Sequence, residues 1–142
     1  MVGHNHSDNV VCTYEVPMIV TTNLEGGVYT DTVNRTGHHY TLETTFDAVL
    51  ADYDAHRLHL IRIGSGSNRT VNGNVITIRI GESITVEPSM GYSELIWKSN
   101  DTSVMTVGTD GTITGIGAGI NAVIAFNENY EEEYWTIKVL EN

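Results

Sequence analysis

The chain has 142 residues and carries 7 Lys and Arg side chains against 18 Asp and Glu, a formal net charge of −11. The first seventy residues contribute 4 basic and 8 acidic side chains (net −4), and the remaining seventy-two contribute 3 and 10 (net −7). Both halves are therefore acidic, which excludes nucleic-acid binding through phosphate neutralisation and docking on anionic lipid. With 40% hydrophobic and 18% charged residues, the composition is that of a globular protein of one domain or two small ones.

Cysteine use and the N-terminal sequence set the expected compartment. Cys12 is the single cysteine, so the sequence excludes an intrachain disulfide and a CxxC metal site. Residues 1–9 are polar and lack the basic and apolar regions of a secretory signal. No apolar run approaches the ~20 residues that span a bilayer. We expect a chain that is made and folded in a cytoplasm and has no membrane partner.

Most of the first seventy residues predict β-strands. The expected strands are rich in β-branched side chains and cover residues 10–16, 18–22, 28–33 and 57–63. Pro17 suits an edge or a bend between the first two, and the Glu-Gly-Gly sequence at 25–27 is a turn signal. In the last of these strands, alternation places Leu58 and Leu60 on one face and the intervening residues on the other.

One segment of the first half has a helical pattern instead. Phe46, Val49, Leu50 and Tyr53 follow the i, i+3, i+4, i+7 spacing, and the threonines at 44–45 precede them as candidate caps. The pattern predicts a single short helix of about ten residues.

The two halves differ in their marker residues, and a polar segment separates them. All six histidines lie before residue 70 and both tryptophans after it. Residues 64–73 (GSGSNRTVNG) are small and polar, which predicts a linker or an exposed loop. We therefore expect a β-rich N-terminal region at 1–70 and a second domain at 71–142.

The second half predicts a compact antiparallel sandwich. Seven short strands, with Gly, Pro, Asn or Asp in nearly every gap, are expected at residues 75–80, 83–86, 95–98, 104–107, 112–116, 121–126 and 134–140. Alternation places Leu95 and Trp97 on one face of their strand. In the last strand, it directs Trp135 and Ile137 inward and Thr136 outward.

Five linked motifs occur in order in this half. Residues 81–88 read GESITVEP, an opening strand followed by proline, and residues 97–107 read WKSNDTSVMTV. Residues 109–115 read TDGTITG, residues 119–125 read GINAVIA, and a closing strand follows at 134–139. On these motifs, the segment from about residue 75 to 140 resembles the group 2 bacterial Ig-like domain. The resemblance implies an Ig-like β-sandwich that carries no active site.

The motif residues have structural roles. Asp110 and Gly111 suit a tight hairpin turn that needs a positive φ, and Trp97 is expected to fill the core between the two sheets. The chain departs from the family pattern at Met105, where alanine is usual, and we interpret this as a packing variant. It also departs in the strongly acidic segment 127–133. We interpret that segment as a solvated loop, with a binding edge as the alternative.

Histidines form the candidate metal site. His56 and His59 have metal-like spacing, and His38 and His39 could add a third ligand. However, His56 at a helix end and His59 on a strand are expected to point in different directions. We therefore predict no metal and no cofactor, and keep a small metal-dependent enzyme that uses these histidines as a minor alternative.

Two further patterns suggest chemistry without supporting it. Asp52 and Asp54 form an acidic pair of the kind used in acid–base catalysis or Ca²⁺ binding, but two acids in the last turn of a helix are ordinarily solvated. Gly115, Gly117 and Gly119 lack the third glycine spacing of a dinucleotide loop and the helix that follows it. We expect no enzyme activity and assign no catalytic, cofactor-binding or metal-binding residue.

The resemblance therefore carries the functional prediction. Group 2 Ig-like domains occur in bacterial surface adhesins and in phage virion proteins, and a short chain with one such module and no secretion signal fits the second class. We predict a phage head decoration protein whose first ~70 residues bind the major capsid protein and pair with other copies as a dimer or trimer. The acidic Ig-like half would face solvent and make weak contacts with cell-surface glycans. The alternatives are a tail-tube or tail-associated virion protein, and a bacterial cell-surface adhesion or carbohydrate-binding module.

Overall fold

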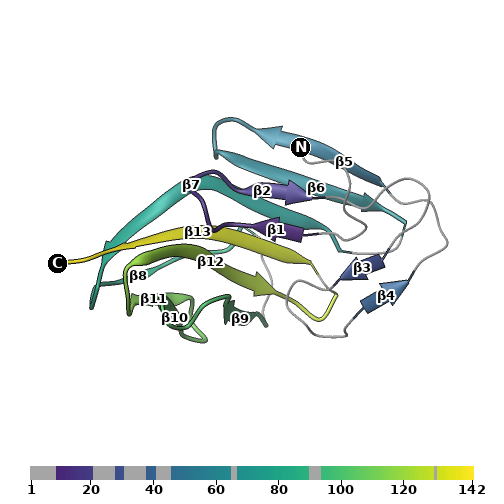
Figure 1. Cartoon of the computed structure of the whole chain (residues 1–142). Coiled ribbons are helices and arrows are strands. Elements are labelled where there is room, and N and C mark those ends of the chain that lie inside the picture. Colours follow the sequence, from purple (N-terminus) through teal and green to yellow (C-terminus); the bar gives the residue numbers. More distant parts are fainter. Residues whose placement is uncertain are drawn as a thin grey trace.

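The computed structural model describes residues 9–20, 28–30, 38–40, 46–64, 67–89, 94–129 and 131–142. These residues form strands and no helix, which confirms the mainly β fold class (Figure 1). The described strands are β1 (Asn9–Val11), β2 (Met18–Val20), β3 (Val28–Thr30), β4 (His38–Tyr40), β5 (Phe46–Asp52), β6 (Arg57–Ile63), β7 (Arg69–Arg79), β8 (Ser83–Thr85), β9 (Ile96–Ser99), β10 (Met105–Val107), β11 (Thr112–Gly115), β12 (Gly119–Phe126) and β13 (Glu132–Leu140). The described residues contain no helix that is long and apolar enough to cross a lipid bilayer.

A six-stranded sheet with the order β5-β6-β7-β13-β12-β9 forms the centre of the molecule. Its neighbouring strands are antiparallel except for β7 and β13, which are parallel. A three-stranded sheet has the order β10-β11-β8, and two hairpins pair β1 with β2 and β3 with β4. In Figure 1, β5 lies at the upper edge of the central sheet, β9 lies at its lower edge, and β1 and β2 lie across it.

Each face of the central sheet carries its own apolar core. The hairpin core, which packs against the β1–β2 segment, consists of Val10, Cys12, Leu60, Val71, Ala122, Ile124, Phe126 and Tyr134. The tryptophan core, which packs against the three-stranded sheet, consists of Ile78, Val86, Met105, Ile113, Val123, Ala125, Trp135, Ile137 and Val139. Successive residues of β13 enter opposite cores because side chains alternate along a strand. Strands β12 and β13 are therefore buried on both faces.

All seven strands predicted in the second half are present, with bounds shifted by a few residues. Leu95 and Trp97 pack against the tryptophan core, whereas Ile96 between them is 57% exposed. Trp135 points inward as predicted. The prediction that Thr136 faces solvent is wrong, because its side of β13 is buried beside Cys12.

The turn at Asp110 and Gly111 has the predicted geometry. Gly111 adopts a φ of 79°, a region that residues with a side chain rarely occupy. A Cβ atom there would also lie 2.8 Å from Cζ2 of Trp97 and 2.8 Å from the carbonyl oxygen of Val86. Glycine is therefore required both by the backbone and by the tryptophan that closes the core.

The helix predicted over residues 46–53 is wrong. These residues form β5, which pairs antiparallel with β6 along its whole length, and the turn that follows it. A helical stripe would bury Val49 and Leu50, whereas they are 61% and 59% exposed. The strand is fixed by partners distant in sequence, among them Arg62, which binds Asp47 across the β5–β6 pair. Periodicity within the segment carries no information about such a partner.

Half of the segment predicted as a linker or an exposed loop, residues 69–73, belongs to strand β7, which pairs with β6 on one side and β13 on the other. The register against β13 shifts across residues 72–74, which form a bulge, and the amide of Gly73 donates a hydrogen bond to the carbonyl of His56 at 2.7 Å. The boundary expected at residue 70 thus falls inside a strand that joins the two halves in one sheet.

Candidate functional site

The turn between β5 and β6 carries the acidic pair and one of the histidines that the sequence singles out. Asp52 closes the turn, because its Oδ1 accepts a hydrogen bond of 2.9 Å from the amide of Ala55. His56 adopts a φ of 53° in the left-handed region, directly before β6 begins. Asp52, Asp54 and His56 therefore lie at a hairpin turn, and the predicted helix end is wrong.

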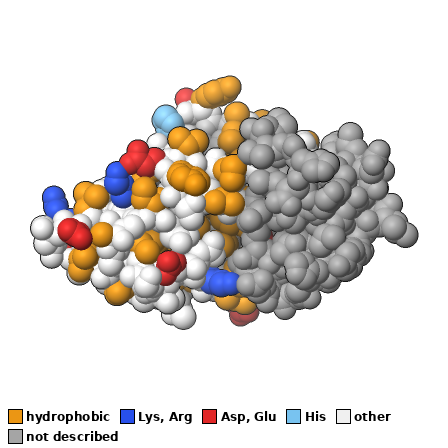
Figure 2. Space-filling view, in the orientation of Figure 1, with side chains coloured by type: hydrophobic (Ala, Val, Ile, Leu, Met, Phe, Trp, Pro, Cys, Tyr) orange, Lys and Arg blue, Asp and Glu red, His pale blue; other side chains and the backbone are white. Residues whose placement is uncertain are grey.

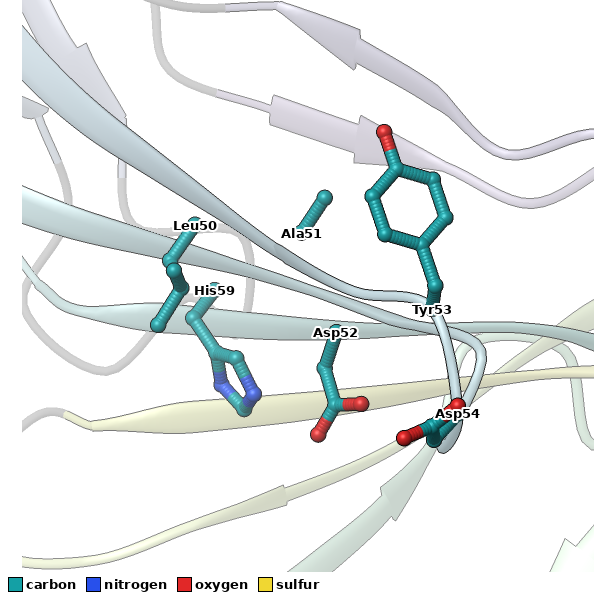
Figure 3. A pocket seen from close by; sticks show the side chains of 6 residues that line it. All are labelled: Leu50, Ala51, Asp52, Tyr53, Asp54 and His59. Atoms are coloured by element: carbon teal, nitrogen blue, oxygen red, sulfur yellow. The ribbon is translucent and has the colours of Figure 1, made fainter.

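An open depression of about 490 Å³ lies beside this turn (Figure 3). Its lining residues are Leu50, Ala51, Asp52, Tyr53, Asp54 and His59. Figure 3 shows Leu50, Asp52 and His59 projecting from the same side of the hairpin, and Tyr53 projecting from the opposite side. This agrees with the register, in which Leu50 lies directly across from His59. The depression thus places a carboxylate and an imidazole next to an aliphatic side chain.

The polar groups of the depression are held in place by the protein itself. Asp52 accepts the turn hydrogen bond, and Nδ1 of His59 lies 3.1 Å from Oγ1 of the buried Thr70 on β7. A carboxylate and an imidazole fixed in this way can form hydrogen bonds with the hydroxyl groups of a bound ligand. Chemically, the depression therefore offers hydrogen-bonding groups to a polar, hydroxyl-bearing ligand.

The structure does not bring the candidate metal-binding histidines together where it describes them. His56 is exposed in the turn, and His59 lies on β6 next to Thr70. Among the described residues, no group of three or more His, Cys, Asp or Glu side chains converges as metal ligands. The side chains of His38 and His39 lie outside the described part of the chain, although the backbone of β4 is described.

Sequence reasoning missed two buried carboxylates at the start of β13. The interpretation of segment 127–133 as a solvated loop is wrong at both ends, because Asn127, Glu132 and Glu133 are 5%, 1% and 0% exposed. A signal was present in the sequence. Glu133 lies two residues before Trp135, so the alternation that directs Trp135 inward places Glu133 on the same face. Extending the predicted strand by two residues would have placed Glu133 on the inner face.

Internal partners satisfy the carboxylate of Glu133. Its Oε1 accepts a hydrogen bond of 2.9 Å from Nδ2 of Asn72, and its Oε2 accepts from the amide and hydroxyl of Ser89 at 2.9 and 3.0 Å. Nε of Arg57 lies 4.0 Å from Oε1. Nδ2 of Asn72 also donates to the carbonyl of Tyr134 at 3.0 Å, so a side chain of the β7 bulge replaces part of the sheet pairing. These contacts assign the cluster a structural role.

A second buried ionic cluster joins β5, β6 and β7. Oδ1 of Asp47 accepts a hydrogen bond of 2.8 Å from Nε of Arg62, and Oδ2 accepts from Nη2 of Arg62 at 3.1 Å and from Nη2 of Arg69 at 2.8 Å. All three side chains are only 2% exposed. Because a buried charge is costly unless it is paired, this cluster fixes the edge hairpin to the rest of the sheet.

Displaced pKa values occur at structural positions away from the depression. Burial in the hairpin core raises the pKa of the Cys12 thiol. A hydrogen bond from the Ser103 hydroxyl lowers the pKa of Asp101, and one from the Thr112 amide lowers the pKa of Asp110. Both carboxylates accept these hydrogen bonds from residues two positions later, so they stabilise turns of the second half.

The glycines at 115–119 serve close packing of strands. Gly115 ends β11, and Gly119 begins β12, so a strand follows where a dinucleotide loop would have a helix. A Cβ atom on Gly115 would lie 2.6 Å from the carbonyl oxygen of Arg79. The glycine therefore permits the end of β11, the middle strand of the three-stranded sheet, to approach the end of β7.

Comparison with known proteins identifies no relative. No family model matches the chain, and no curated protein shows significant similarity to it. The resemblance to the group 2 bacterial Ig-like domain therefore depends on the motifs and remains a prediction.

Proposed function

We propose that the strands from β7 to β13 form an Ig-like sandwich of the group 2 bacterial type. In Ig-like sandwiches, seven strands A to G divide between two sheets, with E between B and D in one, and F between C and G in the other. If β7 to β13 are A to G, the three-stranded sheet has the order D-E-B and the central sheet contains A-G-F-C. The strand order thus supports the family that the motifs resemble, with the first strand paired to the last.

The positions of the motif residues support the same proposal. The rings of Trp97 and Trp135 stack with centroids 5.5 Å apart at the tryptophan core. Met105, at the position where the family usually has alanine, is completely buried in this core. Its longer side chain fills space between the sheets, which is the packing role that the sequence suggests.

On this basis, we propose that the protein is a phage virion structural protein and, more specifically, a head decoration protein. The observation that carries the proposal is the continuity of the central sheet, in which β5 and β6 are joined to the Ig-like strands through β7. A module that shares one sheet with N-terminal strands forms a single rigid unit, which suits fixed attachment on a symmetric lattice.

Surface chemistry suggests how such a protein would be oriented. Ile61 and Ile63 of β6 are each 46% exposed, and hydrophobic side chains lie in the upper part of the molecule, where Figure 1 places β5 and β6 (Figure 2). This apolar surface would contact the major capsid protein. Residues 71–142 carry the larger share of negative charge, and mutual repulsion between outward-facing acidic modules would keep particles dispersed. The protein would be made in the host cytoplasm and remain in the virion.

The proposal is tested with heads that were assembled without this protein. Purified chain is mixed with the heads, and bound protein is measured after sedimentation through a density gradient. Saturable binding, with a stoichiometry set by the capsid lattice, is expected. Absence of binding to heads overturns the head assignment, and binding to isolated tails instead supports the tail-associated alternative.

Two matched variants locate the attachment surface. Ile63→Ser changes the β6 surface and is expected to weaken binding to heads, whereas Ile116→Ser changes a residue of equal exposure in the Ig-like half and should have no effect. Both isoleucines are 46% exposed, so the two substitutions remove similar amounts of exposed apolar surface. Equal weakening by both variants would contradict attachment through the β5–β6 hairpin.

A further inference from the structure

The central sheet has two edges that differ in length and chemistry. Exposed strand edges are templates for pairing with another chain, and proteins commonly block them with short strands, lysine, proline or bulges. At one edge, β9 has only four residues and includes Lys98. At the other edge, β5 has seven residues and contains no lysine, proline or glycine. Among the described strands, β6 alone pairs with β5.

The middle of β5 is apolar and accessible on both faces. Residues 48–51 read Ala-Val-Leu-Ala, and Val49 and Leu50, which point to opposite faces, are 61% and 59% exposed. Tyr53, directly after the strand, is 86% exposed. A seven-residue strand is about 23 Å long, so this edge offers one continuous row of backbone groups and apolar side chains.

Charge favours a second copy of this chain at this edge. Two chains of net charge −11 repel one another, so copies associate most easily where the contact surface is neutral. The carboxylate of Asp47 is buried and bound by Arg62 and Arg69, which removes its charge from the edge. Residues 48–51 carry no charge at all. An antiparallel strand edge is also self-complementary, because a two-fold axis brings the same backbone groups together in pairs.

We propose that β5 is the self-association edge of this protein and pairs antiparallel with β5 of a second copy about a two-fold axis. Paired residues share a face, so even-numbered residues lie across from even-numbered ones and odd from odd. Only the register centred on Val49 pairs all seven residues of the strand. It places Val49 across from its own copy, Leu50 across from Ala48, and Asp47 across from Ala51. No carboxylate then lies directly across from another.

The inference stands on β5 itself, so it is tested on the purified full chain without any capsid. Sedimentation velocity over a range of concentrations is expected to show a monomer–dimer equilibrium. Val49→Lys introduces two like charges across the two-fold axis, and the dimer dissociation constant should rise about 100-fold or more. Ile96→Lys is the matched control, because Ile96 is 57% exposed on the opposite edge strand, and it should leave the dimer unchanged. Circular dichroism checks that both variants are folded.

A cysteine variant tests the register independently of the lysine variant. Val49→Cys should form a covalent dimer under mild oxidation, because the two sulfur atoms meet at the axis, whereas Ile96→Cys should not. The native Cys12 is 2% exposed and serves as an internal control for non-specific oxidation. A wild-type chain that stays monomeric up to about 1 mM overturns the inference. Cross-linking that is equal in both cysteine variants overturns it as well. Neither result bears on binding to heads, which is measured separately.

Discussion

The two cores on either side of β13 are built in different ways. The tryptophan core takes all of its buried residues from one stretch of chain, between Ile78 and Val139. The hairpin core joins Val10 and Cys12 to residues as distant as Tyr134. On the same face of the central sheet, the buried Asp47 cluster continues the hairpin core towards the sheet edge. The tryptophan core is therefore built from one stretch of the chain, whereas the hairpin core depends on distant segments and adjoins a buried ionic cluster.

Because of this difference, the two cores should respond differently to single substitutions. The stabilisation that apolar contacts provide is roughly proportional to the buried area. The tryptophan core should therefore lose stability in proportion to the side-chain volume removed. A buried ionic cluster behaves differently, because removal of one partner leaves the others without compensation. The Asp47 cluster beside the hairpin core should therefore be sensitive to the loss of a single charge, and the tryptophan core to the loss of side-chain volume.

The largest expected effect comes from truncation in the tryptophan core. Trp135→Ala removes a side chain that is 4% exposed and stacked on Trp97, and it should lower the free energy of unfolding by about 3–5 kcal/mol. Urea denaturation followed by circular dichroism measures the loss. Ile96→Ala, on the exposed face of β9, should cost less than about 1 kcal/mol. Similar losses in the two variants would contradict the assignment of Trp135 to a tightly packed core.

The ionic cluster beside the hairpin core provides the next largest effect. Asp47→Ala leaves the buried guanidinium groups of Arg62 and Arg69 without their shared carboxylate, and it should cost about 3 kcal/mol. Asp54→Ala is the matched control, because Asp54 is an exposed carboxylate next to the same strand, and it should change stability by less than about 0.5 kcal/mol. The same urea series measures both. If the two variants were equally stable, the cluster would not hold β5 to the sheet.

The same contrast explains which features the sequence could predict. In the second half, glycine- and asparagine-rich turns and strict alternation around Trp97 and Trp135 define each strand within a few residues. Local pattern was sufficient there, because turn residues and alternation mark each strand whichever strand it pairs with. Gly111 was predictable for the same reason, since a tight turn needs a positive φ whatever the surroundings.

The first half was harder to predict, because its local patterns fit more than one structure. The spacing of Phe46, Val49 and Leu50 fits a helix as well as an edge strand, and only pairing with β6 decides between them. The polar residues around Asn72 have the composition of a linker, yet the side-chain amide of Asn72 donates hydrogen bonds to Glu133 and to the carbonyl of Tyr134 on β13. The depression next to His59 was likewise hidden, because it exists only when β5 and β6 form a hairpin.

A smaller effect tests how firmly the N-terminal segment covers the hairpin core. Cys12 is 2% exposed, and burial raises the pKa of its thiol, so both access and thiolate formation are restricted in the folded state. At pH 8, a thiol-reactive disulfide reagent should modify Cys12 only slowly in the native protein and rapidly in urea. The native rate therefore reports opening of the β1–β2 segment. A native rate equal to the unfolded rate would show that this segment does not cover the core.

The smallest effect concerns acid stability of the turn that closes the tryptophan core. The pKa of Asp110 is lowered from its ordinary value of 3.8, first by the hydrogen bond from the Thr112 amide and then by the one from the Thr112 hydroxyl. A lowered pKa in the folded state means that the carboxylate stabilises the protein above pH 3.8, and that this stabilisation is lost as the pH falls through the folded-state pKa. Asp110→Asn retains an oxygen acceptor but cannot ionise. The difference in unfolding free energy between the wild type and this variant should therefore be constant near neutral pH and shrink below pH 3.8. Thr109→Ala, at the exposed neighbouring position, should give a difference that is independent of pH. A pH-independent difference for Asp110→Asn would mean that the turn gains nothing from the charge of the carboxylate, and that the geometry of the hydrogen bonds alone holds Gly111 against Trp97.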